Sequence, residues 1–331
     1  MNTLPQSPGL LILPHLRVQN ANAISSPLTH GFPSITAFLS LMWALERKLD
    51  DRFPAIFDSV GVICHEFDEQ VTEGGYTHAF RLTRNPVDKA GNTAGIVEEG
   101  RIHLDITLVF GISGDIINRS QDERDGFAQA VAATLSQMRM AGGSFLPSTL
   151  SARQIRPRLR TFSQDPTAAA DEFRRLRREW LPGFALVCRD DLLRKRTEAL
   201  QAAAPDASTL DAWLDLSRFN WNPVPNETAA PTIDERKAKV EWQHDRQGWI
   251  VPIPVGYAAL SELRPAGAVA SARDASTPFR FVESLYSVGQ WLSPHRLKTC
   301  SDFLWYGYTD IDAGIYRARN DYAVTPSASS N

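Results

Sequence analysis

The sequence holds few cysteines, and none of its apolar runs is long. Cys64, Cys188 and Cys300 are odd in number and far apart, so they form neither a disulfide framework nor a zinc-binding pattern. No run approaches the roughly eighteen apolar residues that a membrane-spanning helix requires. The N-terminus has no basic region ahead of its first apolar stretch, which argues against a signal peptide. We therefore expect a cytoplasmic protein that does not contact a membrane.

The motifs of common enzyme classes are also missing. The chain contains no GxSxG nucleophile motif, no phosphate-binding P-loop and no GxGxxG dinucleotide motif. None of its seven His has a second His or Cys at metal-ligand spacing, and His103-x-Asp105 is the nearest, weak pattern. The adjacent carboxylates Glu98 and Glu99 point in different directions in any regular element. The sequence therefore predicts neither a metal nor a cofactor.

What is present is the composition of a globular protein with one concentrated group of Arg. The chain has 331 residues, 43% of them hydrophobic, and its net charge of −3 by itself argues against a nucleic-acid coat. Residues 153–178 nevertheless include eight Arg and only three acidic residues. A solvated helix face is the commoner explanation of such a group, but Arg in place of Lys suits bidentate phosphate contacts.

The stretch at residues 10–33 changes abruptly from apolar to polar. Residues 10–18 predict a buried strand with Pro14 at an edge or bulge, and the spacing of apolar residues after Pro33 predicts a helix. Between them we expect a long loop, because six amide and hydroxyl side chains occur there: Gln19, Asn20, Asn22, Ser25, Ser26 and Thr29. Such side chains need partners, which either their own turns or a ligand could supply.

The order of the predicted elements up to residue 147 is strand, helix, strands, helix, strand, which is typical of a ferredoxin-like or RRM-like domain in an α+β fold. We expect strands at 57–67, 78–82, 101–110 and 144–146, and a helix at 122–140 that Gly142 and Gly143 cap. The strand at 101–110 carries no aromatic platform for stacking bases. Loops and glycine-rich backbone would therefore have to hold any RNA.

Beyond residue 147 the composition changes twice. Residues 148–182 predict an Arg-rich inserted arm, and residues 183–324 a C-terminal α/β portion that completes the body. In that portion we expect a strand at 184–187, helices at 190–204, 209–219 and 293–306, a mobile loop at 220–245 and a disordered tail at 325–331. Pro252 and Pro254 argue against a central strand at 249–257.

Several segments, in order along the chain, resemble one protein family. They are QNANAISSPLTHGFP from Gln19, LTRNP from Leu82, IVEEGR from Ile96, MRMAGGSFLP from Met138, LPGFALV from Leu181, GWIVPIPVGY from Gly248, FRFVESLYSVGQWLSPHRL from Phe279 and DFLWY from Asp302. This series resembles the second Csy subunit of type I-F CRISPR systems, one of the Cas-five-type RAMP proteins. His30 departs from the resemblance, which leads us to expect Trp there, although His also stacks on bases.

The resemblance implies a non-catalytic subunit of a prokaryotic, RNA-guided surveillance complex (Cascade) for antiviral defence. It implies binding of the 5′ handle of the CRISPR RNA (crRNA) together with the large Csy subunit, and capping of the filament of backbone Csy subunits. Contact with the crRNA-processing endoribonuclease and with target DNA would be indirect. Two alternatives stay open: a metal-independent RAMP-type endoribonuclease that uses His15 or His30, and a scaffold that binds only protein.

Under this resemblance we predict RNA contacts in the polar loop, near the glycine turn and at scattered basic positions. These residues are Gln19, Asn20, Asn22, Ser25, Ser26, Thr29, His30, Phe32, Arg84, Asn85, Arg139, Gly142, Gly143, Ser144, Arg280, His295 and Arg296. We predict that the arm contacts RNA or a backbone subunit through Arg153, Arg156, Arg158, Arg174, Arg175, Arg177 and Arg178.

Overall fold

The computed structural model describes residues 7–49, 53–75, 77–84, 87, 90–92, 96–225, 240–244, 246–272 and 274–323. The side chains of residues 82–84, 96–98, 225 and 240 are outside the description as well. Two predictions therefore lie outside the described residues: the RNA contact of Asn85 and the disordered tail at 325–331.

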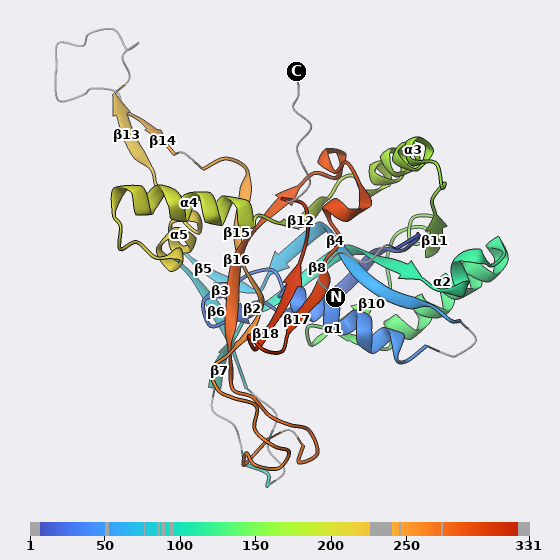
Figure 1. Ribbon diagram of the computed structural model, residues 1–331, viewed down its shortest axis with the longest axis horizontal. Coiled ribbons are helices and arrows are strands. Elements are labelled where there is room, and N and C mark those ends of the chain that lie inside the picture. The colour runs from blue at the N-terminus through green and yellow to red at the C-terminus, as the bar shows by residue number, and fades with distance from the viewer. Residues whose placement is uncertain are drawn as a thin grey trace.

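One curled antiparallel sheet of eleven strands forms the body of the chain (Figure 1). Its strands follow the order β17-β18-β15-β16-β12-β4-β8-β1-β10-β9, and β11 also pairs with β1. Strands from both ends of the sequence thus share one sheet. Their bounds are β1 (Gly9–Asn22), β4 (Ile56–Glu69), β8 (Arg101–Ser113), β9 (Arg139–Met140), β10 (Gly143–Leu146), β11 (Arg158–Thr161), β12 (Phe184–Cys188), β15 (Trp249–Ala259), β16 (Val282–Leu292), β17 (Tyr306–Asp310) and β18 (Ile315–Arg319).

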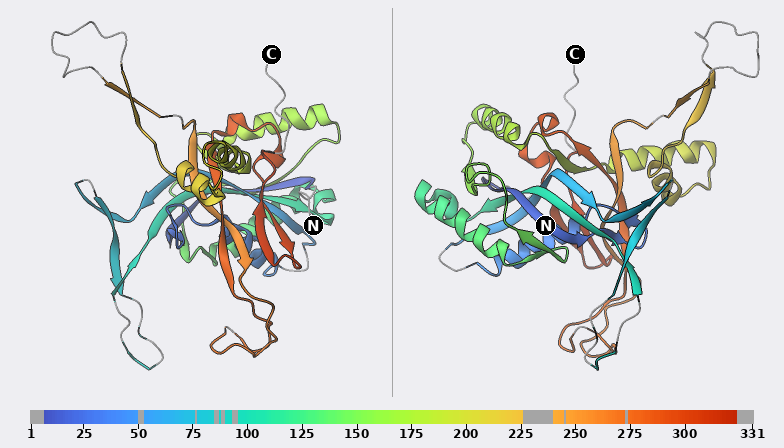
Figure 2. Two further views of the ribbon diagram at one scale, coloured as in Figure 1. Left: turned by 60° about the vertical axis from the view of Figure 1, so that its left-hand side comes forward. Right: turned by 180° about the vertical axis from the view of Figure 1, so that it is seen from behind.

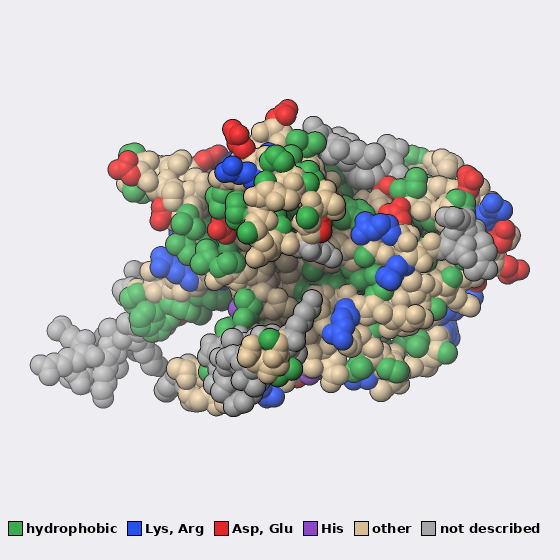
Figure 3. Space-filling view, turned by 90° about the horizontal axis from the view of Figure 1, so that it is seen from below, with side chains coloured by type: hydrophobic (Ala, Val, Ile, Leu, Met, Phe, Trp, Pro, Cys, Tyr) green, Lys and Arg blue, Asp and Glu red, His purple; other side chains and the backbone are tan. Residues whose placement is uncertain are grey.

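Three smaller strand groups extend from this body (Figure 2). They are the hairpin of β2 (Ile24–Ser26) and β3 (Thr29–His30), the sheet of β5 (Val71–Gly74), β6 (Thr77–Arg84) and β7 (Ile96–Glu99), and the hairpin of β13 (Asn222–Pro225) and β14 (Val240–Gln243). Seen from below, the surface is hollowed near its middle, and hydrophobic side chains border the hollow (Figure 3).

Helices pack on both faces of the sheet because successive side chains of its strands point to opposite sides. Leu11 and Leu13 of β1 belong to the core beneath α1 and α2, whereas Leu10 and Ile12 belong to a second core beneath α3. The helices are α1 (Ile35–Glu46), α2 (Gln121–Ser136), α3 (Pro166–Leu176), α4 (Asp190–Ala203) and α5 (Thr209–Leu216). The described residues also form the 3₁₀ turns η1 (Asp115–Asn118), η2 (Arg177–Trp180), η4 (Pro294–Arg296) and η5 (Cys300–Asp302).

The elements predicted from strong periodicity are confirmed, with ends that differ by a few residues. They include β1 with its bulge after Leu13, next to Pro14, and α1, β4, β8, α2, β12, α4 and α5. Within residues 1–147 the order β1, α1, β4, β8, α2, β10 is observed, with further hairpins inserted. The assignment to an RRM-like RAMP domain, and the division of the chain at residues 147 and 182, stay predictions.

Two predictions about the N-terminal half are wrong. The polar stretch after residue 18 is not a long loop, because β1 continues to Asn22 and the β2–β3 hairpin follows. Gly142 and Gly143 do not cap α2, which ends at Ser136. Instead, Ala141 and Gly142, with φ of 46° and 79°, form the turn between β9 and β10. Two successive residues with positive φ are typical of a tight hairpin turn.

Three predictions about the C-terminal half are also wrong. The strand with Pro252 and Pro254 lies inside the sheet as β15, between β16 and β18. Because β18 pairs with it only at residues 256–258, both prolines lie in the part of β15 that pairs with β16 alone. Residues 293–306 form two 3₁₀ turns instead of a helix, because the Asp302 carboxylate caps a new turn at Thr299. The described ends of residues 220–245 pair as the β13–β14 hairpin.

Candidate nucleic-acid interface

A cavity of about 440 Å³ lies where the ends of β1, β4, β6, β8 and the β9–β10 hairpin meet. We call it the strand-end cavity. Five of the predicted RNA-binding residues line it, although about 120 residues separate the two segments that supply them: Gln19, Asn20, Arg139, Gly142 and Ser144. Pairing of β10 with β1 brings these segments together, since Ser144 lies opposite Gln19.

Local backbone geometry exposes the amides of this cavity. Asn20 has a φ of 58° at an irregularity between Val18 and Ala21, and its N–H donates to His103 Nδ1 over 3.1 Å. Asn is one of the few residues that tolerate this conformation. Gly143 lets the hairpin approach β1, because a Cβ there would lie 2.8 Å from the carbonyl oxygen of Gln19. The Gln19 and Asn20 side chains consequently stay exposed at the cavity.

Among its described lining residues the strand-end cavity is basic, since three guanidiniums face one carboxylate. Arg139 Nη1 donates to the carbonyl of Gly142 over 3.2 Å, and Arg81 Nη1 to Gln70 Oε1 over 3.0 Å. Arg101 forms an ion pair with Glu99 through two hydrogen bonds. Our predicted site did not include Arg81, Gln70 or Arg101. The alternation of the strand at 101–110, which puts Arg101 on its polar face, is the sequence signal for Arg101.

Four other predicted residues hydrogen-bond within the β2–β3 hairpin. The Asn22 side chain donates to the Ile24 carbonyl over 2.8 Å and accepts from the Ile24 N–H over 3.1 Å. The hydroxyls of Ser25 and Ser26 lie 2.8 and 2.6 Å from that of Thr29. Of the two sources of hydrogen-bond partners that the sequence left open, local turns or a ligand, the local turns therefore supply partners for these side chains. Their contact with RNA stays a prediction.

His30 and Phe32 line a second cavity, of about 350 Å³, which we call the aromatic cavity. The His30 ring lies 4.2 Å from the Phe80 ring between centroids, and its Nδ1 is 3.7 Å from Glu69 Oε2. Phe32 stacks on Phe38 at 5.6 Å and meets the edge of Trp291 at 4.9 Å, so it is partly core. Glu69 is followed by Gln70 of the strand-end cavity, which places the two cavities side by side.

Of the remaining scattered basic residues, the three with described side chains, Arg280, His295 and Arg296, do not line the strand-end cavity. Arg84 ends β6 opposite Ile96, three residues beyond Arg81, and its side chain is outside the description. Arg280 packs beside Gly314. His295 and Arg296 are exposed on η4, which contacts η2.

The segment predicted as an arm packs along the sheet. Its buried side chains include Phe173, Leu176 and Trp180 in the second core. Most of its predicted contact residues already have protein partners: Arg156 with Asp125, Arg158 with Glu179, Arg174 with Asp171, and Arg177 with the carbonyl of Leu297. Arg175 and Arg178 are exposed, and Arg153 lines a third cavity.

The described residues offer no group of three or more His, Cys, Asp or Glu that could hold a metal ion. Burial raises the pKa of each of the three thiols to about 12, so Cys64, Cys188 and Cys300 stay protonated at neutral pH. His15 and His30 line different cavities. In the part of the chain that the structure describes, no helix is both long and apolar enough to cross a membrane.

Comparison with known proteins identifies the family. The family of CRISPR-associated Csy2 proteins matches residues 11–318. The chain is also 45% identical, over 318 residues, to the CRISPR-associated protein Csy2 of Pseudomonas aeruginosa (strain UCBPP-PA14). The alignment covers 93% of this chain and 94% of that relative. Because both matches extend over nearly the whole chain, this protein belongs to the Csy2 family and is a subunit of the type I-F CRISPR Csy complex.

Proposed function

We propose that this subunit binds the 5′ handle of the crRNA in the strand-end cavity without cleaving it. The observation that carries the proposal is the convergence of Gln19, Asn20, Arg81, Arg101 and Arg139 from separate strands on one exposed, basic cavity. Proteins that recognise single-stranded RNA combine contacts to base edges with contacts to phosphates.

The chemistry of the cavity divides between these two kinds of contact. The Gln19 and Asn20 amides each present a donor and an acceptor, which is what the edge of an unpaired base requires. Arg139 is exposed and uses Nη1 for the Gly142 carbonyl, which holds the side chain while other N–H groups remain for phosphate. An extruded base can stack on His30, which lines the adjacent aromatic cavity.

Assembly with the large Csy subunit and the backbone subunits is the second part of the proposal. The β13–β14 hairpin extends from the body and, with the residues before it, exposes Phe219, Trp221 and Trp242 by more than half of each side chain (Figure 1). Exposed aromatic groups of this size on a soluble protein mark protein interfaces. Capping of the backbone filament would use such projecting surfaces and leave the strand-end cavity to the RNA.

Ultraviolet crosslinking tests the RNA contact. The chain, purified with its large partner subunit, is crosslinked to labelled repeat-derived RNA, and the crosslinked peptides are mapped by mass spectrometry. We expect crosslinks within residues 19–32 and 138–144. Crosslinks confined to the partner would make this chain a protein-binding scaffold. Cleavage of the RNA that His15→Ala or His30→Ala abolishes would favour the endoribonuclease alternative.

A further inference from the structure

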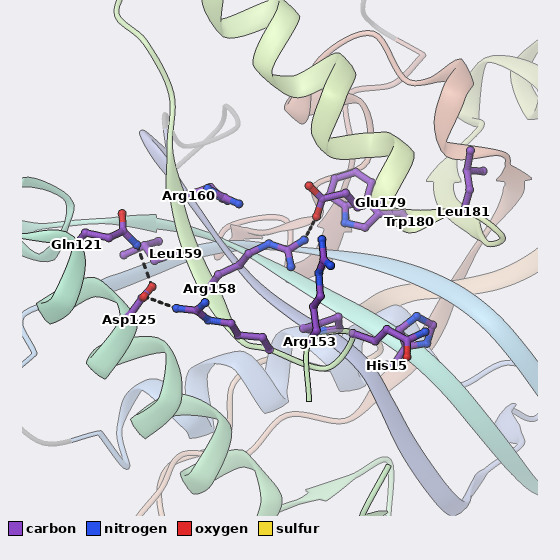
Figure 4. A pocket seen from close by; sticks show the side chains of 13 residues that line it. His15, Gln121, Asp125, Arg153, Arg158, Leu159, Arg160, Glu179, Trp180 and Leu181 are labelled. Atoms are coloured by element: carbon purple, nitrogen blue, oxygen red, sulfur yellow. Dashed lines mark hydrogen bonds and ion pairs between the residues drawn. The ribbon is translucent and has the colours of Figure 1, made fainter. Parts of the chain in front are cut away.

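A third cavity, of about 750 Å³, lies at a gap in the sheet (Figure 4). We call it the arginine cavity; Arg153, Arg156, Arg158 and Arg160 line it together with His15 and Trp180. On one side of β1, β11 pairs with residues 9–12 and β10 with residues 17–19. The edge between these pairings, at Pro14 and His15, opens into the cavity.

Positive charge in this cavity exceeds the negative charge that faces it. Four guanidiniums meet only two carboxylates, those of Asp125 and Glu179. These carboxylates pair with Arg156 and Arg158, whereas Arg153 and Arg160 have no ion pair within the described part of the chain. Burial lowers the pKa of the Arg158 guanidinium against the opposing effect of Glu179, and Arg160 lowers it further. A bound anion would relieve this uncompensated charge.

A buried donor in the wall also lacks an acceptor. The Trp180 side chain is 2% exposed, and its Nε1–H has no hydrogen-bond partner in the described structure. Figure 4 shows this nitrogen on the side of the ring that faces Arg153. The buried Nε of Arg158 is unpartnered as well. Leaving a buried donor unpaired costs about 1–3 kcal/mol, so an acceptor in the cavity would stabilise both groups.

His15 is held at the edge of the same cavity in an unusual conformation. Its φ is 50°, and its ring stacks on His65 with 4.2 Å between centroids. The ring atom Nδ1 of His15 lies 3.1 Å from Asp105 Oδ1, and the backbone N–H of His15 donates to the Thr107 hydroxyl over 3.2 Å. Strained backbone that several contacts maintain is concentrated at functional sites.

The arginine cavity and the strand-end cavity lie along one strand. His15 lines the first and Gln19 the second, and four residues of β-strand span about 13 Å. Arg17 lies between them opposite Asp105 and donates to the Pro147 carbonyl over 3.5 Å. A single RNA strand of a few nucleotides can therefore reach both cavities.

We propose that the arginine cavity binds a backbone phosphate of the same crRNA whose handle occupies the strand-end cavity. This inference rests on the proposed function. A phosphodiester presents several acceptor oxygens to donors that converge from different directions, here Arg153, Arg160 and the Trp180 N–H. A partner's acidic side chain is the alternative, and its carboxylate offers only two oxygens to these donors.

Methylphosphonate scanning of the RNA tests the inference. The chain, purified with its large partner subunit, is titrated with repeat-derived RNAs in which one phosphate at a time is replaced by a neutral methylphosphonate. At one position the substitution should weaken binding by about tenfold, the value of one charge-assisted hydrogen bond. In Arg153→Ala and in Trp180→Phe, which keeps an aromatic ring but removes the N–H, the same substitution should have little further effect.

Two controls separate this inference from the proposed function. Arg194→Ala removes an exposed Arg of α4 outside the cavity and should leave the tenfold effect intact. Arg139→Ala should weaken binding without removing that effect. If wild-type chain binds RNA but no phosphate couples to Arg153 or Trp180, the arginine-cavity proposal is wrong and handle binding stands. If the wild-type chain binds no RNA, both proposals fail. If Arg153→Ala no longer binds the large subunit but keeps its affinity for RNA, the cavity binds an acidic protein partner instead.

Discussion

Two adjacent glycines in the β9–β10 hairpin should respond differently to the same small change. A Cβ on Gly143 would lie 2.7 Å from the Ala21 nitrogen and 2.8 Å from the Gln19 oxygen, both backbone atoms. A Cβ on Gly142 would meet nothing within 4 Å, but its φ of 79° is unfavourable for alanine. Gly143→Ala therefore introduces a clash, whereas Gly142→Ala introduces only backbone strain.

The magnitudes follow from these two causes. Overpacking costs about 1–3 kcal/mol, and the upper end applies to Gly143→Ala because paired backbone cannot move aside as a side-chain end can. A left-handed alanine costs about 1–2 kcal/mol, so Gly142→Ala should be the milder variant. The clash also pushes Ser144 and Arg139 away from Gln19. We expect RNA affinity to fall about tenfold in Gly143→Ala, equivalent to about 1.4 kcal/mol, and to change little in Gly142→Ala.

Urea unfolding gives the stability of both variants, and fluorescence anisotropy with labelled repeat-derived RNA gives the affinity. A Gly143→Ala protein as stable as the wild type would refute the close approach of the hairpin to β1. A destabilised Gly143→Ala protein with unchanged RNA affinity would keep that packing and refute the placement of RNA in the strand-end cavity.

Three further predictions test single contacts. Arg139→Ala should reduce the dependence of log K on log salt concentration by about 0.7, the coefficient for one phosphate on a single strand. Arg194→Ala, at an exposed position of α4, serves as the matched control, and equal slopes in the two variants would exclude a phosphate contact of Arg139. Ser120→Ala removes the capping box that Ser120 and Glu123 form at the start of α2, and should lower the free energy of unfolding in urea by about 1 kcal/mol; an unchanged midpoint would contradict this. Burial lowers the pKa of His65 below its ordinary 6.5, so the folded state binds fewer protons than the unfolded state at mildly acidic pH. The stability that neutral His65 contributes is thus complete above pH 6.5 and is lost as the pH falls through the lowered pKa. The free energy of unfolding should therefore fall less between pH 7 and pH 5 in His65→Gln than in the wild type. An equal fall in the two proteins would assign the pH dependence to other groups.

The elements with strong internal periodicity were predictable without a structure. In these elements the local pattern of apolar residues predicts which face is buried. Examples are the run of branched residues in β1, the alternation in β8 and the helical spacing in α1. The motif segments likewise identified the family, since a series of short motifs in order depends only on the chain. Elements shaped by distant contacts were not predictable, such as β15 with its two prolines or the 3₁₀ turns at 294–302.

The candidate site divides in the same way. Sequence alone singled out Gln19, Asn20, Arg139 and Ser144 as exposed polar or basic residues near turns. It did not distinguish them from Ser26 and Thr29, whose hydroxyls hydrogen-bond to each other in a hairpin.

The sequence by itself determined the family and the residue types available for RNA, because periodicity and motif order are properties of neighbouring residues. Only the tertiary structure decided which of them share a cavity. Pairing of β10 with β1 sets Ser144 beside Gln19, and the ends of β6 and β8 add Arg81 and Arg101. The arginine cavity likewise exists only because folding brings η2 and the start of α2 beside β1 and β11. Contacts between residues more than a hundred positions apart are set by strand register and burial, which no local pattern records.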